Sequence, residues 1–398
     1  MIDQEMSDAL VVGGGIGGLA TALALARAGH SVRLLEQAPE FGEVGAGLQL
    51  APNATRILAE WELLDAVIGA GGVLPRRLVL RDAISGAELT HLDLGDGFRE
   101  RYGAPYVVMH RSDLHTILLE ACARAGVDLT TGSHVRRVDG HEHFAAVHCA
   151  DGRTYRSRAV IAADGLHSTL RGSIVDDDVV TSGHVAYRGT LPADTVASDV
   201  SMDEVVAWIG PDCHLVQYPL RHGDLVNQVA VFRSPAFERG EPEWGLPEEL
   251  DAAFSRCCAT VRSALSGLWR DRRWPMYDRL PADRWVRGRL ALLGDAAHPM
   301  LQYLAQGACQ AIEDAHAMAA EVSKNTTIQQ DDTVRVDWEA ALDGYQNARR
   351  SRAGRVQSVA RTWGEIWHLD GTARLVRNEL LTTRRPDDFT HIDWLYSA

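Results

Sequence analysis

The chain has 398 residues, of which 46% are hydrophobic and 24% are charged, and its formal net charge is −14. This composition is typical of a globular protein with sizeable cores, and the length suits two lobes or more. The acidic excess argues against nucleic acid or an anionic membrane as the main partner, because both attract basic surfaces. A small anionic substrate needs only a local positive potential and is not excluded.

The cysteine and histidine content predicts neither disulfides nor a metal site. The six cysteines form no CxxC pair, so we expect reduced thiols and a cytoplasmic protein. His141 and His143 could share one strand face, but no third ligand follows at a useful spacing. There is no secretory signal pattern, and the longest Ala/Leu-rich run, residues 19–26, is too short for a transmembrane segment.

The first forty residues predict a β-α-β unit, with strands at 9–12 and 31–35 and a helix at 19–28. The turn Gly13-Gly14-Gly15-Ile16-Gly17-Gly18 fits the GxGxxG pattern of dinucleotide-binding folds. Gly13 permits the turn, Gly15 and the helix start at Ile16 approach a pyrophosphate, and Gly18 allows close packing. Glu36 ends the second strand, where an acidic side chain binds ribose hydroxyls.

The rest of the chain predicts two further regions. The expected helices are 54–64, 112–125 with Ser112 as its cap, 248–266 and about 307–322, followed by a loop at 324–332 and two amphipathic helices within 335–380. The expected strands are an antiparallel pair within 74–94, then 184–191, 205–209, 214–219, 227–232 and 290–293. We predict an α/β lobe from residues 1–73, 104–177 and 286–322, a β-rich lobe from 74–103 and 178–285, and a helical segment, 323–398.

Two further motifs follow buried strands. Asp164-Gly165 precedes Ser168 and Arg171, which makes this turn more specific than a plain Asp-Gly turn. Gly294-Asp295 ends a second strand, and the next helix N-terminus should point into the same cleft as the GxGxxG turn.

The three motifs, in this order and spacing, resemble those of the single-component flavoprotein aromatic hydroxylases, the class A FAD monooxygenases. The resemblance covers essentially the whole chain. It implies an α/β protein with a Rossmann-like FAD-binding domain of the p-hydroxybenzoate hydroxylase-like fold, a β-sheet substrate domain and C-terminal helices. It also implies tightly but non-covalently bound FAD, NADH as a transient co-substrate, O2, a small aromatic acid as substrate, and a homodimer. A flavin-bound hydroperoxide would deliver the oxygen atom.

The same resemblance implies roles for individual residues. Glu36 would bind the adenosine ribose, Asp295 the ribityl and pyrophosphate region, and Asp164 both flavin and nicotinamide. Arg111 is similar to an arginine near the pyrophosphate, and the loop Gly45-Ala46-Gly47 to the loop beside the isoalloxazine. The helix start at Gln306, Gly307 and Ala308 would also face the flavin.

Local details are most similar to one subgroup, the 3-hydroxybenzoate 6-hydroxylases. These details are residues 102–115, 213–220 and the loop from His298 to Ala308. In that loop Gln302 stands where most of the family has proline, and the subgroup shares this departure. The resemblance therefore implies hydroxylation of 3-hydroxybenzoate para to its hydroxyl, giving 2,5-dihydroxybenzoate (gentisate).

Hydroxylation of a phenol needs a base, because the phenolate is the better nucleophile. His214 is the candidate, since histidine offers a pKa near neutrality. The alternation of strand 214–219 predicts that Tyr218 shares its face. Gln302 could hold the phenol oxygen or the carboxylate, and Tyr106 and Tyr218 could add polar contacts.

Other polar residues are interpreted as structural or as part of the surface. We interpret His298 as fixing its loop, and Arg349, Arg350 and Arg352 as a solvated helix face or a subunit contact. Three other functions stay open: a salicylate 1-hydroxylase that yields catechol or another monohydroxybenzoate hydroxylase, a flavin or nicotinamide dehydrogenase without oxygen insertion, and a non-catalytic dinucleotide-binding protein. The sequence does not decide between NADH and NADPH.

Overall fold

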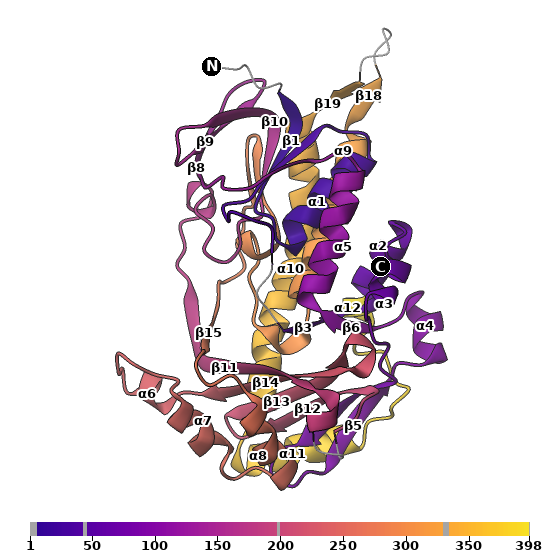
Figure 1. Cartoon of the computed structure of the whole chain (residues 1–398), viewed down its shortest axis with the longest axis vertical. Coiled ribbons are helices and arrows are strands. Elements are labelled where there is room, and N and C mark those ends of the chain that lie inside the picture. The colour runs from indigo at the N-terminus through magenta and orange to yellow at the C-terminus, as the bar shows by residue number, and fades with distance from the viewer. Residues whose placement is uncertain (1–5, 43–45, 197–199, 329–333, 398) are drawn as a thin grey trace.

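The computed structural model describes residues 6–42, 46–196, 200–328 and 334–397. The protein has an α/β fold in which two large sheets lie one above the other and a long helix, α10, connects them (Figure 1). Each sheet has its own layer of helices, and the space between the sheets holds the cavity described below.

The first sheet is a mostly parallel sheet of the Rossmann type. Its strands follow the order β16-β17-β10-β1-β2-β7, and a hairpin of β8 and β9 adjoins β10. Strand β1 is parallel to both β2 and β10, and its residues are largely buried, as expected for a strand covered on both faces. The bounds are β1 Ser7–Val12, β2 Val32–Leu35, β7 Asp128–Thr130, β8 Val135–Gly140, β9 Ala145–Cys149, β10 Thr154–Ala162, β16 Val286–Arg287 and β17 Leu290–Leu292.

Helices α1, α5 and α9 cover this sheet, with α1 packed between the other two. Their bounds are α1 Ile16–Arg27, α5 Arg111–Arg124 and α9 Gly307–Lys324. Helix α1 follows β1 after a short turn, and α9 follows β17 after the loop 293–306, so their N-termini lie at the same edge of the sheet, where the carboxyl ends of β1 and β17 meet.

The second sheet has the order β15-β11-β14-β13-β12-β4-β5 and is antiparallel except for the parallel pair β12 and β4. One face packs on α7 and α8 through residues such as Tyr187 and Leu215, and the other face is turned towards the first sheet. The bounds are β4 Arg77–Asp82, β5 Glu88–Asp93, β11 Val180–Pro192, β12 Glu204–Gly210, β13 Cys213–Leu220, β14 Leu225–Arg233 and β15 Trp274–Asp278, with α7 Pro247–Phe254 and α8 Ala259–Ala264.

The C-terminal region is helical. Helix α10, Trp338–Trp367, has 30 residues and is about 45 Å long, so it reaches from α9 to the second sheet. The other elements are β3 Gly47–Leu50, α2 Pro52–Glu60, α3 Leu64–Gly69, α4 Asp96–Tyr102, β6 Val107–His110, α6 Pro235–Glu238, β18 Thr326–Ile328, β19 Val334–Val336, α11 Gly371–Thr382 and α12 Asp393–Tyr396. No helix among the described residues is both long and apolar enough to cross a bilayer.

Four expectations about local structure are wrong. The cap of α5 is His110, whose side chain accepts a hydrogen bond from the backbone N–H of Ser112. The helix expected at 54–64 ends at Glu60, because the chain turns through Glu62 at φ 59°. The helix expected at 248–266 is broken at Cys258, whose N–H bonds to the carbonyl of Ala83.

The fourth concerns the polar stretch at 324–332. Three of its residues form strand β18, which pairs with β19, and residues 329–332 lie outside the described part of the chain.

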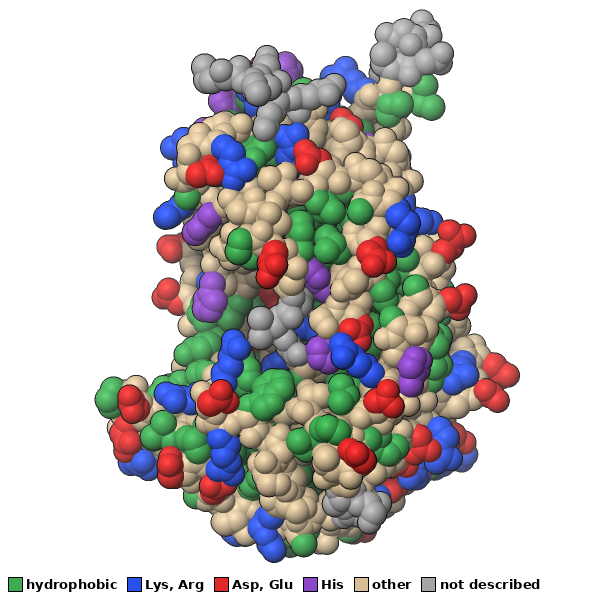
Figure 2. Space-filling view, viewed as in Figure 1, with side chains coloured by type: hydrophobic (Ala, Val, Ile, Leu, Met, Phe, Trp, Pro, Cys, Tyr) green, Lys and Arg blue, Asp and Glu red, His purple; other side chains and the backbone are tan. Residues whose placement is uncertain are grey.

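On the face shown in Figure 2, basic and acidic side chains are interspersed, so this face offers no broad positive surface for nucleic acid.

Candidate active site

A cavity of about 620 Å³ lies between the two sheets. Both sheets, the loop before α9 and the C-terminal helices contribute to its lining. The volume is within the usual range of small-molecule sites. Most predicted site residues line it; Gly13, Gly18, Glu36 and Asp164 lie just behind the wall, in the turns that support it.

The glycine turn after β1 is packed too tightly for side chains. Gly13 has φ 106°, and a Cβ atom there would lie 2.4 Å from the carbonyl oxygen of Ala163. A Cβ atom on Gly18 would lie 1.9 Å from the carbonyl oxygen of Gly13. Gly15 is the N-cap of α1 and provides no capping side chain, so the first N–H groups of the helix, from Ile16 on, are left for another acceptor.

Helix α9 presents a second N-terminus to the same cavity. Gly307 and Ala308 line the cavity, and no side chain caps this helix either. Asp295 lies in the preceding turn and also lines the cavity. Two uncapped helix N-termini that meet at one cavity form a site for a negatively charged group such as a pyrophosphate.

The carboxylates behind this wall are held by backbone N–H groups. The side chain of Glu36 accepts hydrogen bonds from Gly14 and Ala38, both at 2.7 Å. Asp164 Oδ2 accepts from Thr169, whereas its Oδ1 is buried and has no hydrogen-bond partner among the described residues. Burial raises the pKa of Asp164.

Arg171 ties the Asp164 turn to the Asp295 loop. Its guanidinium donates to the carbonyls of Ala296 at 2.7 Å and Ala297 at 2.8 Å and pairs with Asp177. The conspicuous arginine of this motif is therefore a structural link between two turns.

The first residue of β3, Gly47, lies against the second sheet. A Cβ atom on Gly47 would lie 2.4 Å from the ring of Tyr218, and the Gly47 N–H donates to the side chain of Asn227 at 2.9 Å. Arg111 lines the cavity, and its N–H donates to the carbonyl of Ala46. Gly45, the other glycine of this loop, lies outside the described residues.

The inner face of the second sheet forms an apolar floor. Paired strand positions place Leu80, Ala207, Val216 and Val229 in one row across β4, β12, β13 and β14, and all four line the cavity. His214 and Tyr218 lie two residues to either side of Val216 on this face, as the alternation predicts.

His214 is buried at one end of the floor. Its Nδ1 lies 2.8 Å from Nε2 of His368, and its ring lies 5.3 Å from that of Tyr303 and 5.1 Å from that of Trp367. Burial lowers the pKa of His214 to about 3, because charging the ring would cost its hydration. The expectation of a near-neutral pKa for His214 is therefore wrong.

Gln302 and two tyrosines complete this part of the site. Gln302 lines the cavity, and its side chain makes no hydrogen bond to any described residue. Tyr303 packs against α10 at Gly364, where a Cβ atom would lie 2.5 Å from its ring. The hydroxyl of Tyr106 donates to Gln49 Oε1 at 2.6 Å.

Sequence reasoning missed Arg188, which lines the cavity from β11 and continues the apolar row beside Val229. It forms no ion pair or side-chain hydrogen bond with any described residue, and its guanidinium lies 5.4 Å from the ring centre of Trp274. Burial lowers its pKa. The sequence signal that could have found Arg188 is its position in the strand, where the alternation of side chains predicts an inward, apolar residue.

The comparisons with known proteins identify the family. Residues 6–360 match the model of the family described as "FAD binding domain". The chain belongs to this family. It is 39% identical to the 3-hydroxybenzoate 6-hydroxylase of Polaromonas naphthalenivorans, over 97% of this chain and 95% of that protein. It is 37% identical to the 3-amino-4-hydroxybenzoate 2-monooxygenase of Streptomyces cremeus, over 100% of this chain and 96% of that protein.

The fold comparison agrees with the sequence comparison. Klebsiella pneumoniae HpxO, solved in complex with FAD and uric acid, superimposes with a TM-score of 0.82 at 25% identity, over 98% of this chain and 95% of that one. The chain is thus an FAD-dependent aromatic monooxygenase, and it acts on an aromatic substrate with O2.

The monooxygenase has the features that FAD requires. The crowded glycine turn, the two uncapped helix N-termini and the unpartnered Oδ1 of Asp164 all lie along one wall of the cavity or directly behind it. Gly47 lines the cavity beside this wall, and the ring of Tyr218 fills the space that a side chain there would need. These residues fit a dinucleotide whose pyrophosphate lies at the helix N-termini.

A buried ionic network lies behind the loop that joins β17 to α9 in the monooxygenase. We call it the closed network, and its members are His298, Glu313, Asp314 and Arg349. Asp314 accepts hydrogen bonds from His298 at 2.5 Å and Arg349 at 2.7 Å, and Arg349 also pairs with Glu313. The Arg349 guanidinium and the hydrogen bond from His298 hold the pKa of Asp314 well below its usual range. The network confirms His298 as a loop-fixing residue.

The closed network also corrects the interpretation of the C-terminal arginines. Arg349 is only 4% exposed and Arg352 pairs with Glu313, so neither belongs to a solvated face. Helix α10 therefore turns this side towards α9, which packs against it.

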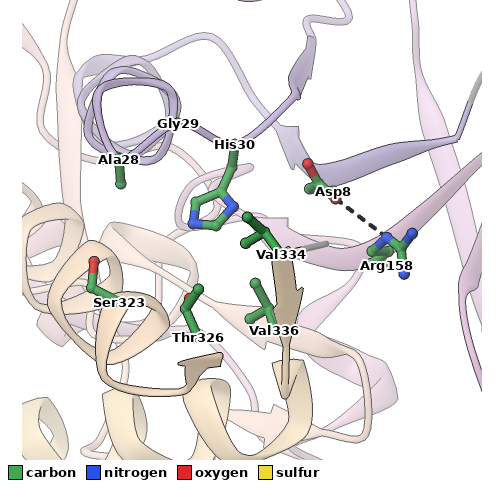
Figure 3. Close-up of a pocket in the computed structure, with 9 residues that line it drawn as sticks. All are labelled: Asp8, Ala28, Gly29, His30, Arg158, Ser323, Thr326, Val334 and Val336. Atoms are coloured by element: carbon green, nitrogen blue, oxygen red, sulfur yellow. Dashed lines mark ion pairs between the residues drawn. The ribbon is translucent and has the colours of Figure 1, made fainter. Parts of the chain in front are cut away.

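A second cavity, of about 370 Å³, lies far from these residues, between β1, the turn that follows α1 and β19 (Figure 3). Its charged groups are paired with each other: Arg158 lies 3.2 Å from Asp8.

Among the described residues, no group of three histidine, cysteine or acidic side chains gathers as a metal site, and His141 and His143 are exposed.

Proposed function

We propose that the monooxygenase hydroxylates 3-hydroxybenzoate para to its hydroxyl, with NADH and O2 as co-substrates, and releases 2,5-dihydroxybenzoate. The observation that carries this proposal is the polarity of the cavity. An apolar floor lies between a largely buried cation without a counterion among the described residues, Arg188, and the polar groups His214 and Gln302. An aromatic acid with a phenolic hydroxyl complements both ends.

Arg188 gives the cavity its preference for an anion. A buried guanidinium without a counterion is costly, and a substrate carboxylate would offset that cost by a charge-assisted hydrogen bond. Tyr218 and Arg188 line the same cavity, and the hydroxyl of Tyr218 would share the carboxylate. The ring would then rest on Val216 and Val229.

At the other end, His214 and Gln302 would hold the phenol. Nδ1 of His214 is engaged with His368, so Nε2 is the nitrogen that would take the phenol proton. The low pKa of His214 does not oppose this step, because the phenolate formed beside it would stabilise the imidazolium. Gln302 would donate a hydrogen bond to the same oxygen. Reduced FAD supplies the activation of O2.

The positions of the residues around the cavity also support roles in cofactor binding. We propose that Gly13, Gly15, Ile16 and Gly18 with Gly307, Ala308 and Asp295 surround the pyrophosphate and ribityl chain, that Glu36 binds the ribose, and that Gly47, Arg111 and Asp164 serve the flavin end. Residues 1–73, 104–177 and 286–322 would form the FAD domain, and residues 74–103 and 178–285 the substrate domain. A homodimer stays a prediction.

The test is product identity. The purified protein, supplied with FAD, NADH and O2, is given 3-hydroxybenzoate, salicylate, 4-hydroxybenzoate and 3-amino-4-hydroxybenzoate in turn, and products are separated by chromatography. We expect gentisate from the first acid, with matching oxygen and NADH consumption. Catechol from salicylate as the main product would favour a decarboxylating hydroxylase instead. Equal NADH oxidation with and without any acid would contradict substrate hydroxylation.

A further inference from the structure

His368 lies at the end of α10 and is fixed from two directions. Its N–H bonds to the carbonyls of Gly364 and Glu365, which close the helix. Its carbonyl accepts a hydrogen bond from Asp212 at 3.1 Å, in the turn that leads into β13 and His214. The backbones that carry the two imidazoles are therefore tied together directly.

The contact between the two rings is a hydrogen bond with one donor and one acceptor. His214 Nδ1 and His368 Nε2 are 2.8 Å apart, and the ring planes differ by 21°. Burial lowers the pKa of both rings, so both are neutral at neutral pH. Either ring could then donate to the other.

Proton transfer from a phenol to His214 fixes which of the two rings donates the hydrogen bond. When the phenol O–H bond breaks and an N–H bond forms at Nε2 of His214, the substrate becomes a phenolate and His214 an imidazolium with two N–H groups. The Nδ1–H group is buried and needs an acceptor, because an unmet charged donor is costly. His368 Nε2 is the acceptor that lies in place.

We propose that His368 is a positioning residue of the hydroxylation: it accepts the Nδ1–H of His214 and thereby makes His214 competent to take the phenol proton. This inference rests on the proposed function of His214. The surrounding rings restrict other orientations, since Trp367 lies edge-on to His214 and Tyr303 lies 5.6 Å from His368. His184 stacks on the far side of His368 at 4.8 Å and forms no hydrogen bond to it.

The experiment compares two substitutions of His368 in the FAD-loaded enzyme. His368→Gln keeps an acceptor near the position of Nε2, whereas His368→Leu removes it. We expect His368→Leu to bind substrate within a few-fold of wild type, to lose hydroxylation on the order of 10²-fold, and to lose the phenolate absorption of the bound substrate. His368→Gln should retain most of both signals. His184→Gln is the matched control and should change neither.

A double substitution distinguishes an effect of His368 through His214 from a general packing defect. If His368 acts only through His214, then His214→Ala with His368→Leu hydroxylates no more slowly than His214→Ala alone. Additive losses would overturn the proposal, and so would full phenolate formation in His368→Leu or a His368→Gln variant as impaired as His368→Leu. The wild-type enzyme is assayed first with the hydroxybenzoate panel, so an error in the proposed substrate is seen separately.

Discussion

Two clusters of largely buried polar side chains differ in how their charges are met: one lies behind the loop that carries Gln302, and the other lines the cavity. In the closed network, Arg349 is paired with both Asp314 and Glu313. In the second, which we call the open cluster and which consists of Arg188, His214 and Gln302, the guanidinium and the amide have no partner among the described residues. Both clusters are desolvated, but only the closed network offsets that cost internally.

The difference separates structural from functional polar groups. A buried cation with two carboxylates stabilises the fold once it is formed, and removing one partner leaves uncompensated charge. A buried cation without a carboxylate lowers the stability of the fold and is retained where a ligand supplies the missing charge. The comparison predicts that substitutions in the two clusters have opposite signatures: loss of stability in one, loss of ligand binding in the other.

The largest effect should come from the closed network. Arg349→Met leaves Asp314 buried without its guanidinium partner and leaves Glu313 with Arg352 alone, and we expect the free energy of unfolding to fall by about 3–5 kcal/mol. Arg350→Met, one residue along the same helix and only partly buried, should change it by roughly 0.5 kcal/mol or less. Denaturant unfolding measures both; equal stability of the two variants would contradict the role of the network.

Arg188→Gln should show the reverse signature. We expect 3-hydroxybenzoate to bind about 2–5 kcal/mol more weakly, at least roughly 30-fold, while the free energy of unfolding stays the same or rises. Titration of the flavin spectrum measures affinity, with 3-hydroxybenzyl alcohol as the neutral ligand that should lose little. Arg272→Gln, an exposed arginine near the same Trp274 ring, is the control. Weaker FAD binding with an unchanged acid preference would assign Arg188 to the flavin.

The two clusters should also respond to acid in different pH windows. The pKa of His214 is about 3 in the folded protein, below the ordinary value of 6.5, so the unfolded chain binds more protons between these values. Stability therefore falls as the pH drops below 6.5, and His214→Leu should reduce that slope. Asp314 has a lowered pKa, so its stabilisation is lost only as the pH falls below about 4. Unfolding curves at pH 7, 5 and 3.5 separate the windows; an unchanged slope in His214→Leu between pH 7 and 5 would contradict the assignment.

The smallest effect should come from Gln302→Ala. The side chain makes no hydrogen bond within the described protein, so stability should be unchanged. Loss of one hydrogen bond to the substrate should weaken binding by roughly 2- to 10-fold and increase NADH oxidation without product. Coupling is measured as gentisate formed per NADH consumed. A variant that changes only in stability would remove Gln302 from the substrate site.

Local sequence predicted the parts of the site that depend on local geometry. The glycine turn needs φ 106° at Gly13 and close contact at Gly18, and only glycine meets both conditions, so the pattern is readable in the chain itself. The strand period of two placed His214 and Tyr218 on one face without knowledge of the fold. The prediction that His298 fixes its loop also relied on its immediate neighbours.

The tertiary structure decided how these groups are charged and paired. His214 and His368 are 154 positions apart, and Asp314 and Arg349 meet only because α9 and α10 pack together. No local pattern gave Arg349 a buried place or left Arg188 without a counterion. Sequence therefore determined the residue types and their faces, whereas burial and long-range contacts determined the pKa of His214 and the unmet charge of Arg188, because both depend on what the folded chain removes from water.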